Sequence, residues 1–64
     1  MTRKDYVRIA EAIFEVRFAI AQHGGNMDAV SGVRATAEAI ADVLQADNPR
    51  FNRWRFLLAC GLAD

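Results

Sequence analysis

The sequence predicts an all-α protein, built as a helical hairpin of two longer antiparallel helices followed by a short third helix at the C-terminal end. Three observations predict this fold. Apolar residues recur three and four positions apart over residues 6–20 and again over residues 30–44. A Gly-Gly pair separates these two stretches, and an Asn-Pro pair follows the second. The chain has 64 residues, so we expect one small helical domain over residues 1–64.

The first helix has a start signal, because Thr2 can act as N-cap with Asp5 three residues later in a capping-box arrangement. Two neighbouring apolar rows follow: Tyr6, Ile9, Ile13, Val16 and Ile20 in one, and Val7, Phe14, Phe18 and Ala21 in the other. Together they cover roughly 200° of the helix circumference, whereas a surface helix needs a stripe of about 100°. Either this helix is central and touched from two sides, or part of it faces another chain. We expect it to end near His23, before Gly24-Gly25.

The second helix is expected to begin after Asn26, with Asn26 or Asp28 as its cap. Its apolar seam is narrow and bordered by small alanines that allow close helix approach. The seam comprises Val30, Val33, Ala37, Ile40 and Leu44. The helix should end at Asp47-Asn48-Pro49, since proline disfavours helical geometry in the residue before it.

The third helix is short, with Asn52 as its expected cap. Phe51 and Phe56 have the spacing of a hydrophobic staple across this cap. Phe56, Leu57 and Cys60 should form the inward face, and Gly61 is a natural stop.

Composition argues against enzymatic, metal-dependent and membrane-spanning classes. One cysteine cannot form an internal disulfide, and one histidine with one cysteine cannot make a zinc cluster. No nucleophile–base pair is recognisable, so we expect no catalytic residues, no metal and no cofactor. No apolar run reaches the ~18 residues of a membrane span, and no apolar core of a signal peptide follows the basic N-terminus. A free thiol without a signal peptide favours the cytoplasm.

The formal net charge is zero, yet the charges are separated along the chain. Residues 48–64 carry three arginines against one aspartate, whereas residues 21–47 carry one arginine against four acidic residues. The basic stretch is interleaved with aromatics from Arg50 to Phe56. It could track phosphates and stack on bases, pair with the acidic second helix of its own chain or of a copy, or meet an external protein.

Two groups of residues are candidates for contacts outside the chain. The partner-binding candidates are Arg50, Arg53, Trp54, Arg55 and Leu58; Trp54 and Leu58 either extend the core sideways or form an exposed anchor. The candidates for an oligomer interface are Tyr6, Phe14, Arg17 and Phe18. Arg17 falls inside the apolar arc of the first helix, where it either extends its head to water along the apolar surface or forms an ion pair with the second helix or a partner.

The C-terminal stretch, residues 48–61, reads NPRFNRWRFLLACG. It resembles the signature NPRFxRxRFLxACG of small proteins encoded by bacteriophages and prophages. The opening, residues 1–6 and 9–13, is similar to theirs as well, whereas residues 23–33 are not part of the resemblance. The chain departs from the family pattern at Asn52, where an acidic residue is frequent, and at Trp54, where a small residue is common. The resemblance implies a phage accessory protein that acts inside a bacterium, and the family has no settled activity. Very short phage proteins without active sites often dock onto host proteins, including CRISPR and other defence components, and this class supplies the expectation of a host partner.

Three functions follow, in order of preference. The first is a non-enzymatic protein–protein interaction module, homo-oligomeric, that binds and modulates a host bacterial protein, for example as an anti-CRISPR inhibitor. The second is a small nucleic-acid-binding or regulatory protein that uses Arg50, Arg53, Trp54 and Arg55. The third is a structural role in virion or complex assembly.

Overall fold

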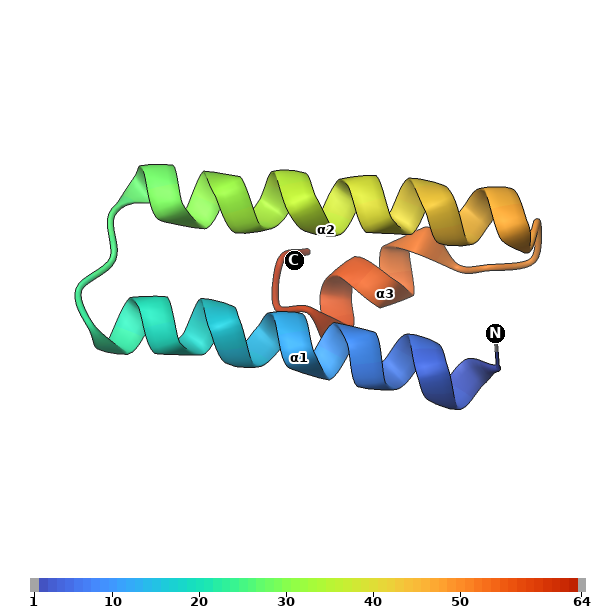
Figure 1. Ribbon diagram of the computed structural model, residues 1–64, viewed down its shortest axis with the longest axis horizontal. Coiled ribbons are helices and arrows are strands. Elements are labelled where there is room, and N and C mark those ends of the chain that lie inside the picture. The colour runs from blue at the N-terminus through green and yellow to red at the C-terminus, as the bar shows by residue number, and fades with distance from the viewer. Residues whose placement is uncertain (1, 64) are drawn as a thin grey trace.

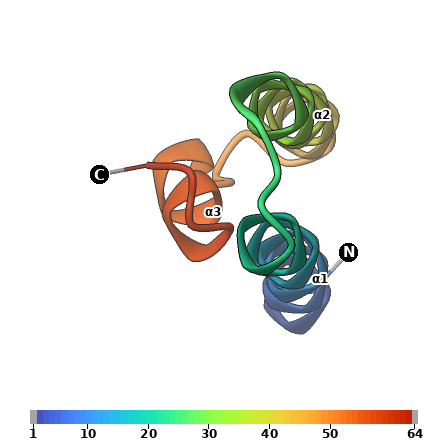
Figure 2. The ribbon, with the colours of Figure 1, turned by 90° about the vertical axis from the view of Figure 1, so that its left-hand side faces the viewer.

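The computed structural model describes residues 2–63 and contains three helices in that range: α1 (Arg3–Gln22), α2 (Met27–Asp47) and α3 (Arg53–Ala59). α1 and α2 run antiparallel, and α3 lies against them near the start of α1 and the end of α2 (Figure 1). Seen along the hairpin, the three helices occupy the corners of a triangle (Figure 2). The predicted hairpin with a short third helix is confirmed.

Each helix begins at a residue whose side chain or neighbour satisfies free backbone amides. The Thr2 backbone N–H donates to the Asp5 carboxylate at 3.0 Å, which forms the predicted capping box. The Asn26 side-chain oxygen accepts from the Ala29 amide at 3.0 Å, so Asn26 rather than Asp28 caps α2. The Asn52 side-chain oxygen accepts from the Arg55 amide, also at 3.0 Å.

The last turn of α3 closes in a Schellman motif, in which the residue after the helix cap adopts a left-handed backbone. Gly61 has φ +77°. Its N–H donates to the Leu58 carbonyl and the Leu62 N–H donates to the Leu57 carbonyl, both at 2.9 Å. This turn reverses the chain and buries Leu62, which is 4% exposed. α1 ends in the same way at Gly24, with φ +71°.

The core forms where α3 packs against the hairpin. Its buried residues are Ala10, Ala37, Ala41, Leu44, Phe51, Phe56, Cys60 and Leu62. The ring centroids of Phe51 and Phe56 are 5.5 Å apart, and Tyr6 meets the Phe51 ring edge-on at 4.9 Å. The three buried alanines of α1 and α2 let the helices approach closely enough for these rings to close the core.

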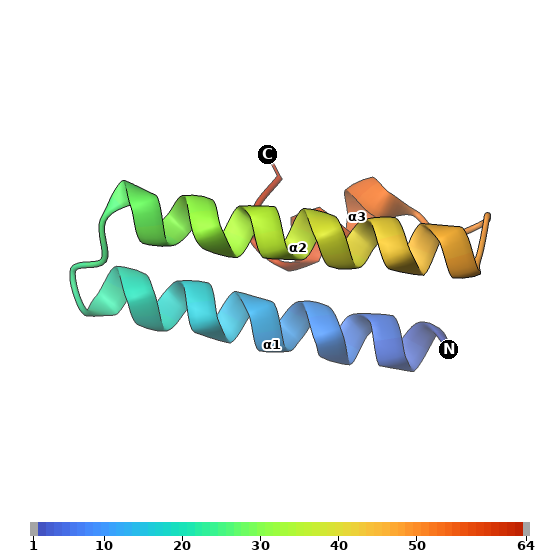
Figure 3. The same cartoon turned by 45° about the horizontal axis from the view of Figure 1, so that its top comes forward.

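α3 covers one side of the hairpin only: in Figure 3 it lies behind α2. On that side Phe14 of α1 approaches Gly61, since a Cβ added to Gly61 would lie 3.0 Å from the Phe14 ring. By helical periodicity Val16 and Val43 fall on the flanks of their helices away from α3, and they are 53% and 68% exposed. Of the two apolar rows of α1, neither is fully covered.

Candidate interaction surfaces

Arg53, one of the predicted partner-binding residues, is engaged within the chain. Its guanidinium forms an ion pair with the Asp42 carboxylate of α2, and the same nitrogen lies 3.5 Å from the Glu38 carbonyl oxygen. One face of α3 is thereby held against α2. The basic stretch therefore pairs with the acidic second helix of its own chain at Arg53.

Trp54 and Leu58 lie one turn apart on the outward side of α3, opposite the buried Phe56 and Cys60. They are 57% and 43% exposed. Neither side chain closes the core, and both are accessible, as a binding anchor requires. Because the Arg53 ion pair and the buried Phe56 fix α3 against the hairpin, these two side chains lie on a rigid element.

The four candidates for an oligomer interface are divided by the fold. Phe14 and Phe18 are exposed on α1, and their rings stack with centroids 6.3 Å apart. Tyr6 is instead half-buried against Phe51, and its hydroxyl oxygen accepts from the Asn48 side-chain amide at 3.4 Å.

Arg17, the fourth candidate, is half-buried. Its Nε is covered and meets no hydrogen-bond acceptor in the part of the chain that the structure describes. Within residues 2–63 it forms no ion pair with α2. Of the four candidates, Phe14 and Phe18 thus provide the accessible apolar area.

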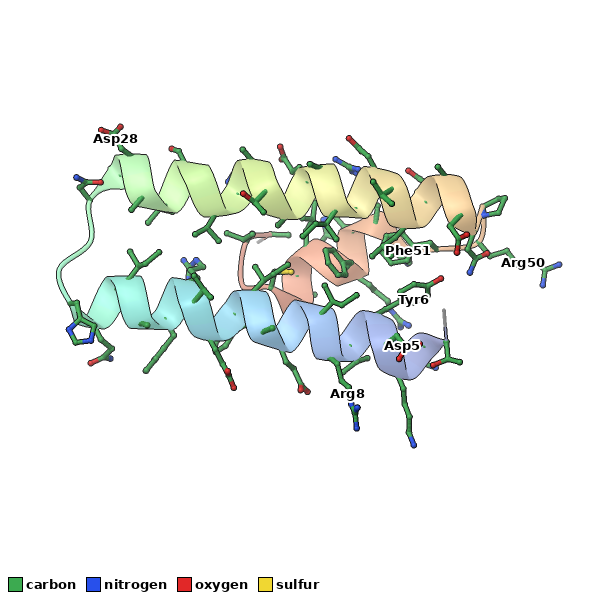
Figure 4. The ribbon with its side chains drawn as sticks, viewed as in Figure 1. Asp5, Tyr6, Arg8, Asp28, Arg50 and Phe51 are labelled. Carbon is green, nitrogen blue, oxygen red and sulfur yellow. The ribbon has the colours of Figure 1, made fainter. Side chains whose placement is uncertain are left out.

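A cleft of about 500 Å³ opens between the start of α1, the α2–α3 connection and α3. Its polar lining consists of Arg3, Tyr6, Asn48, Arg50, Asn52 and Arg55. Its apolar lining consists of Val7, Ala10, Phe51, Phe56 and Ala59. Figure 4 shows Tyr6, Phe51 and Arg50 gathered at this end of the molecule. Among residues 2–63, three arginines and no carboxylate border the cleft.

Sequence reasoning singled out Arg50 and Arg55 but missed the cleft, because Arg3 joins them only through the tertiary fold. The Arg50 backbone N–H donates to the Asn48 side-chain oxygen at 3.1 Å, which shapes the loop that carries Arg50. The basic opening of the chain was the one sequence signal for Arg3. Nothing local to that opening indicates that it meets the C-terminal arginines.

A second hollow of about 390 Å³ lies between α1 and α3, and it is lined by Glu11, Phe14, Glu15 and Ala59. Ala59 borders both hollows, so the two adjoin. The charge along this side of the molecule thus changes from basic at Arg3 to acidic at Glu11 and Glu15.

The groups that could support chemistry are few. Burial raises the pKa of the Cys60 thiol, because the thiolate would lose its hydration. The thiol is therefore protonated near neutral pH. Over residues 2–63 no three His, Cys, Asp or Glu side chains are grouped to hold a metal ion. None of the described helices combines the length and apolar character needed to cross a bilayer.

No protein-family model matches the chain, and no curated protein or solved structure matches it.

Proposed function

We propose that this chain is a non-enzymatic protein–protein interaction module that binds a host bacterial protein in the cytoplasm and modulates it. A specific form of this proposed function is inhibition of a defence component such as a CRISPR effector. One observation carries the proposal: Trp54, the only tryptophan of the chain, is 57% exposed on a helix that is held from beneath. The resemblance of residues 48–61 to a phage-encoded signature supports the bacterial setting.

The energetics of binding favour Trp54 as an anchor. Tryptophan and arginine dominate the residues whose truncation costs most binding free energy. Arg53 and the buried Phe56 already fix α3 in the free protein. Little conformational entropy is then lost when a partner covers Trp54 and Leu58, so more of the contact free energy appears as affinity.

The proposal includes self-association through Phe14 and Phe18. Their stacked rings form an accessible apolar area on α1, a different helix from the one that carries Trp54. An isologous dimer would place this area against its own copy. The two surfaces therefore allow a dimer to present two copies of Trp54.

Capture from a bacterial lysate tests the proposal. A tagged chain is recovered from nuclease-treated lysate with its partners identified by mass spectrometry, beside the variants Trp54→Ala and Val43→Ala. Val43 is a matched control, since it is 68% exposed on α2. We expect one stoichiometric host protein with the wild type and Val43→Ala, and about a 30-fold weaker recovery with Trp54→Ala, as for a residue contributing ~2 kcal/mol.

Unchanged helicity by circular dichroism shows that Trp54→Ala folds. Wild-type recovery of the partner by folded Trp54→Ala contradicts the proposed surface. Sizing of the purified chain tests the dimer, which Phe18→Ser should shift toward monomer. Concentration-dependent large species would instead favour the assembly role.

A second candidate is a nucleic-acid-binding or regulatory protein, and the grouping of Arg3, Arg50 and Arg55 around one cleft favours it. Such binding would fall steeply with salt, because phosphate contacts release counterions. The ion pair of Arg53 with Asp42 and the adjacent Glu11 and Glu15 weigh against it. Loss of the captured material on nuclease treatment would support this second function.

A further inference from the structure

We infer that the cleft at the start of α1 binds a short acidic segment of a partner protein. Its carboxylates would meet Arg3, Arg50 and Arg55, and an apolar side chain would lie against Val7 and Ala59. This inference rests on the proposed function and specifies the chemistry of the partner. The cleft volume of about 500 Å³ is in the range of pockets that enclose small ligands or a few side chains.

The charges of the cleft call for an anion. Arg53 is neutralised by Asp42, whereas within residues 2–63 no ion pair involves Arg3, Arg50 or Arg55. All three are exposed, and no carboxylate of the described residues borders the cleft. A guanidinium matches the two oxygens of a carboxylate with parallel hydrogen bonds. The cleft thus offers three guanidinium groups, and no carboxylate of the described residues competes with a ligand for them.

The lining beneath the arginines calls for an apolar group as well. Val7, which is 46% exposed, and the exposed Ala59 are the accessible apolar residues of the lining. They lie beside Phe51, Phe56 and Ala10, which are already buried in the core. A purely ionic ligand would leave Val7 and Ala59 in contact with water. A peptide that alternates carboxylate and aliphatic side chains would satisfy both, since apolar burial contributes about 25 cal/mol per Å².

The surroundings favour a short peptide over a nucleic acid. The cleft adjoins the hollow that Glu11 and Glu15 border, since Ala59 lines both. A phosphodiester chain that ran from the cleft into this hollow would be repelled there, whereas a peptide can turn away after its acidic residues. The chain also has no net positive charge to support long-range attraction of nucleic acid. Arg55 shares α3 with Trp54, so one partner can reach both the cleft and the tryptophan.

Fluorescence anisotropy with defined probes tests the inference on the purified full chain. The probes are a labelled peptide of alternating glutamate and leucine, the same peptide with glutamine for glutamate, and a single-stranded thymidine oligonucleotide. We expect the glutamate peptide to bind and both other probes to bind at least about tenfold more weakly, a difference of ~1.4 kcal/mol.

Paired variants locate the binding site. Arg3→Glu/Arg55→Glu should weaken binding of the glutamate peptide by about tenfold or more. Arg8→Glu/Arg34→Glu makes the same change in net charge away from the cleft and should change the affinity by less than about threefold. Arg8 projects from α1 away from the other helices (Figure 4), and both control arginines are exposed and lie outside the cleft lining.

Equal binding of the glutamate and glutamine peptides, equal losses in the two paired variants, or tighter binding of the oligonucleotide would each overturn the inference. The same variants separate it from the proposed function. If partner capture requires Trp54 but tolerates Arg3→Glu/Arg55→Glu, the interaction module stands and the acidic ligand of the cleft is wrong. If the glutamate peptide binds the cleft while Trp54→Ala retains the partner, the cleft stands and the α3 anchor is wrong.

Discussion

The two ends of the hairpin differ in how they are held together. Every described residue that is buried lies at or before Ala10, or at or after Ala37, where α3 packs against α1 and α2. Residues 11–36, which include the Gly-Gly connection, contain only half-buried and exposed side chains. Figure 1 shows the reason, since α3 ends well short of that connection. The third helix, rather than the pairing of the two long ones, makes the core.

This difference has consequences for local stability. A segment with few buried apolar contacts opens at a lower free energy than the global unfolding transition. Backbone amides near the Gly-Gly connection should therefore exchange before those around Ala41 and Leu44. The cleft and the Trp54–Leu58 pair lie at the well-packed end, where a partner meets a rigid framework, whereas Phe14 and Phe18 lie in the segment without buried side chains.

The largest expected effect comes from removing the ring at the centre of the α3 end. Phe56 is 4% exposed, so Phe56→Ala should lower the free energy of unfolding by about 3–5 kcal/mol. At the Gly-Gly end, Val30→Ala should cost less than about 1 kcal/mol, because Val30 is only half-buried. Urea unfolding followed by circular dichroism measures both.

Phe56→Ala alone could unfold so small a domain, whose whole stability is about 3–10 kcal/mol by its length. Phe56→Leu keeps most of the side-chain volume and should cost about 1 kcal/mol. Equal losses of unfolding free energy for Val30→Ala and Phe56→Ala would show that the Gly-Gly end is as well packed as the α3 end.

An intermediate effect on the free energy of unfolding is expected from adding a methyl group at Gly61. This residue joins α3 to the buried Leu62. Gly61 has φ +77°, and a Cβ there would lie 3.0 Å from the Phe14 ring. Gly61→Ala should therefore cost about 1–3 kcal/mol. Gly32 lies within α2 with nothing near its added Cβ, so Gly32→Ala should stabilise by about 0.5–1 kcal/mol.

Thermal unfolding of the two glycine variants gives the sign directly, since ~1 kcal/mol shifts the Tm of such a domain by about 4–8 °C. A lower Tm is expected for Gly61→Ala and a higher one for Gly32→Ala. If Gly61→Ala were as stable as the wild type, the Schellman turn would not be what holds Leu62 in the core.

The smallest effect concerns the first turn of α1. The Thr2 backbone N–H, and then its hydroxyl, donate to the Asp5 carboxylate and hold the pKa of Asp5 below its usual value of 3.8. Because the folded-state pKa is the lower one, this stabilisation is present at neutral pH and is lost as the pH falls through the folded-state pKa. Proton NMR titration of the α1 amides should show the first turn fraying as the pH falls through the folded-state pKa of Asp5.

Asp5→Asn should remove this pH dependence of the first turn while leaving α3 packed. Asp28→Asn is the matched control, since Asp28 lies in the first turn of α2 but Asn26 provides the cap. An equal loss of pH dependence in both variants would contradict the assignment of the fraying to Asp5.

The sequence predicted the features that depend on neighbouring residues. Asn52 begins its helix, and Gly24 and Gly61 end theirs, through hydrogen bonds that span only a few positions. For α2 the sequence offered Asn26 or Asp28, and the structure has Asn26 as the cap. The inward placement of Phe56 and Cys60 also followed from helical spacing. The burial of Leu62 was missed, because it depends on the turn that Gly61 makes beyond the periodic segment.

The candidate site was only half visible in the sequence. The basic, aromatic stretch was recognisable, but the sequence did not distinguish the roles of its arginines. In the structure Arg53 pairs with Asp42, whereas Arg50 and Arg55 border a cleft that Arg3 completes. Spacing along one helix cannot indicate which charge meets an acidic neighbour on another helix.

The sequence by itself determined that the chain folds into three helices and where each begins and ends, because caps and stops are local hydrogen-bonding events. The tertiary structure decided which surfaces remain open. Both apolar rows of α1 are equally suited to burial on the helical wheel, and the position of α3 leaves Phe14, Phe18 and Val16 exposed. The position of α3 also brings Arg3 to Arg55, since a cleft arises from the packing of segments that are distant along the chain.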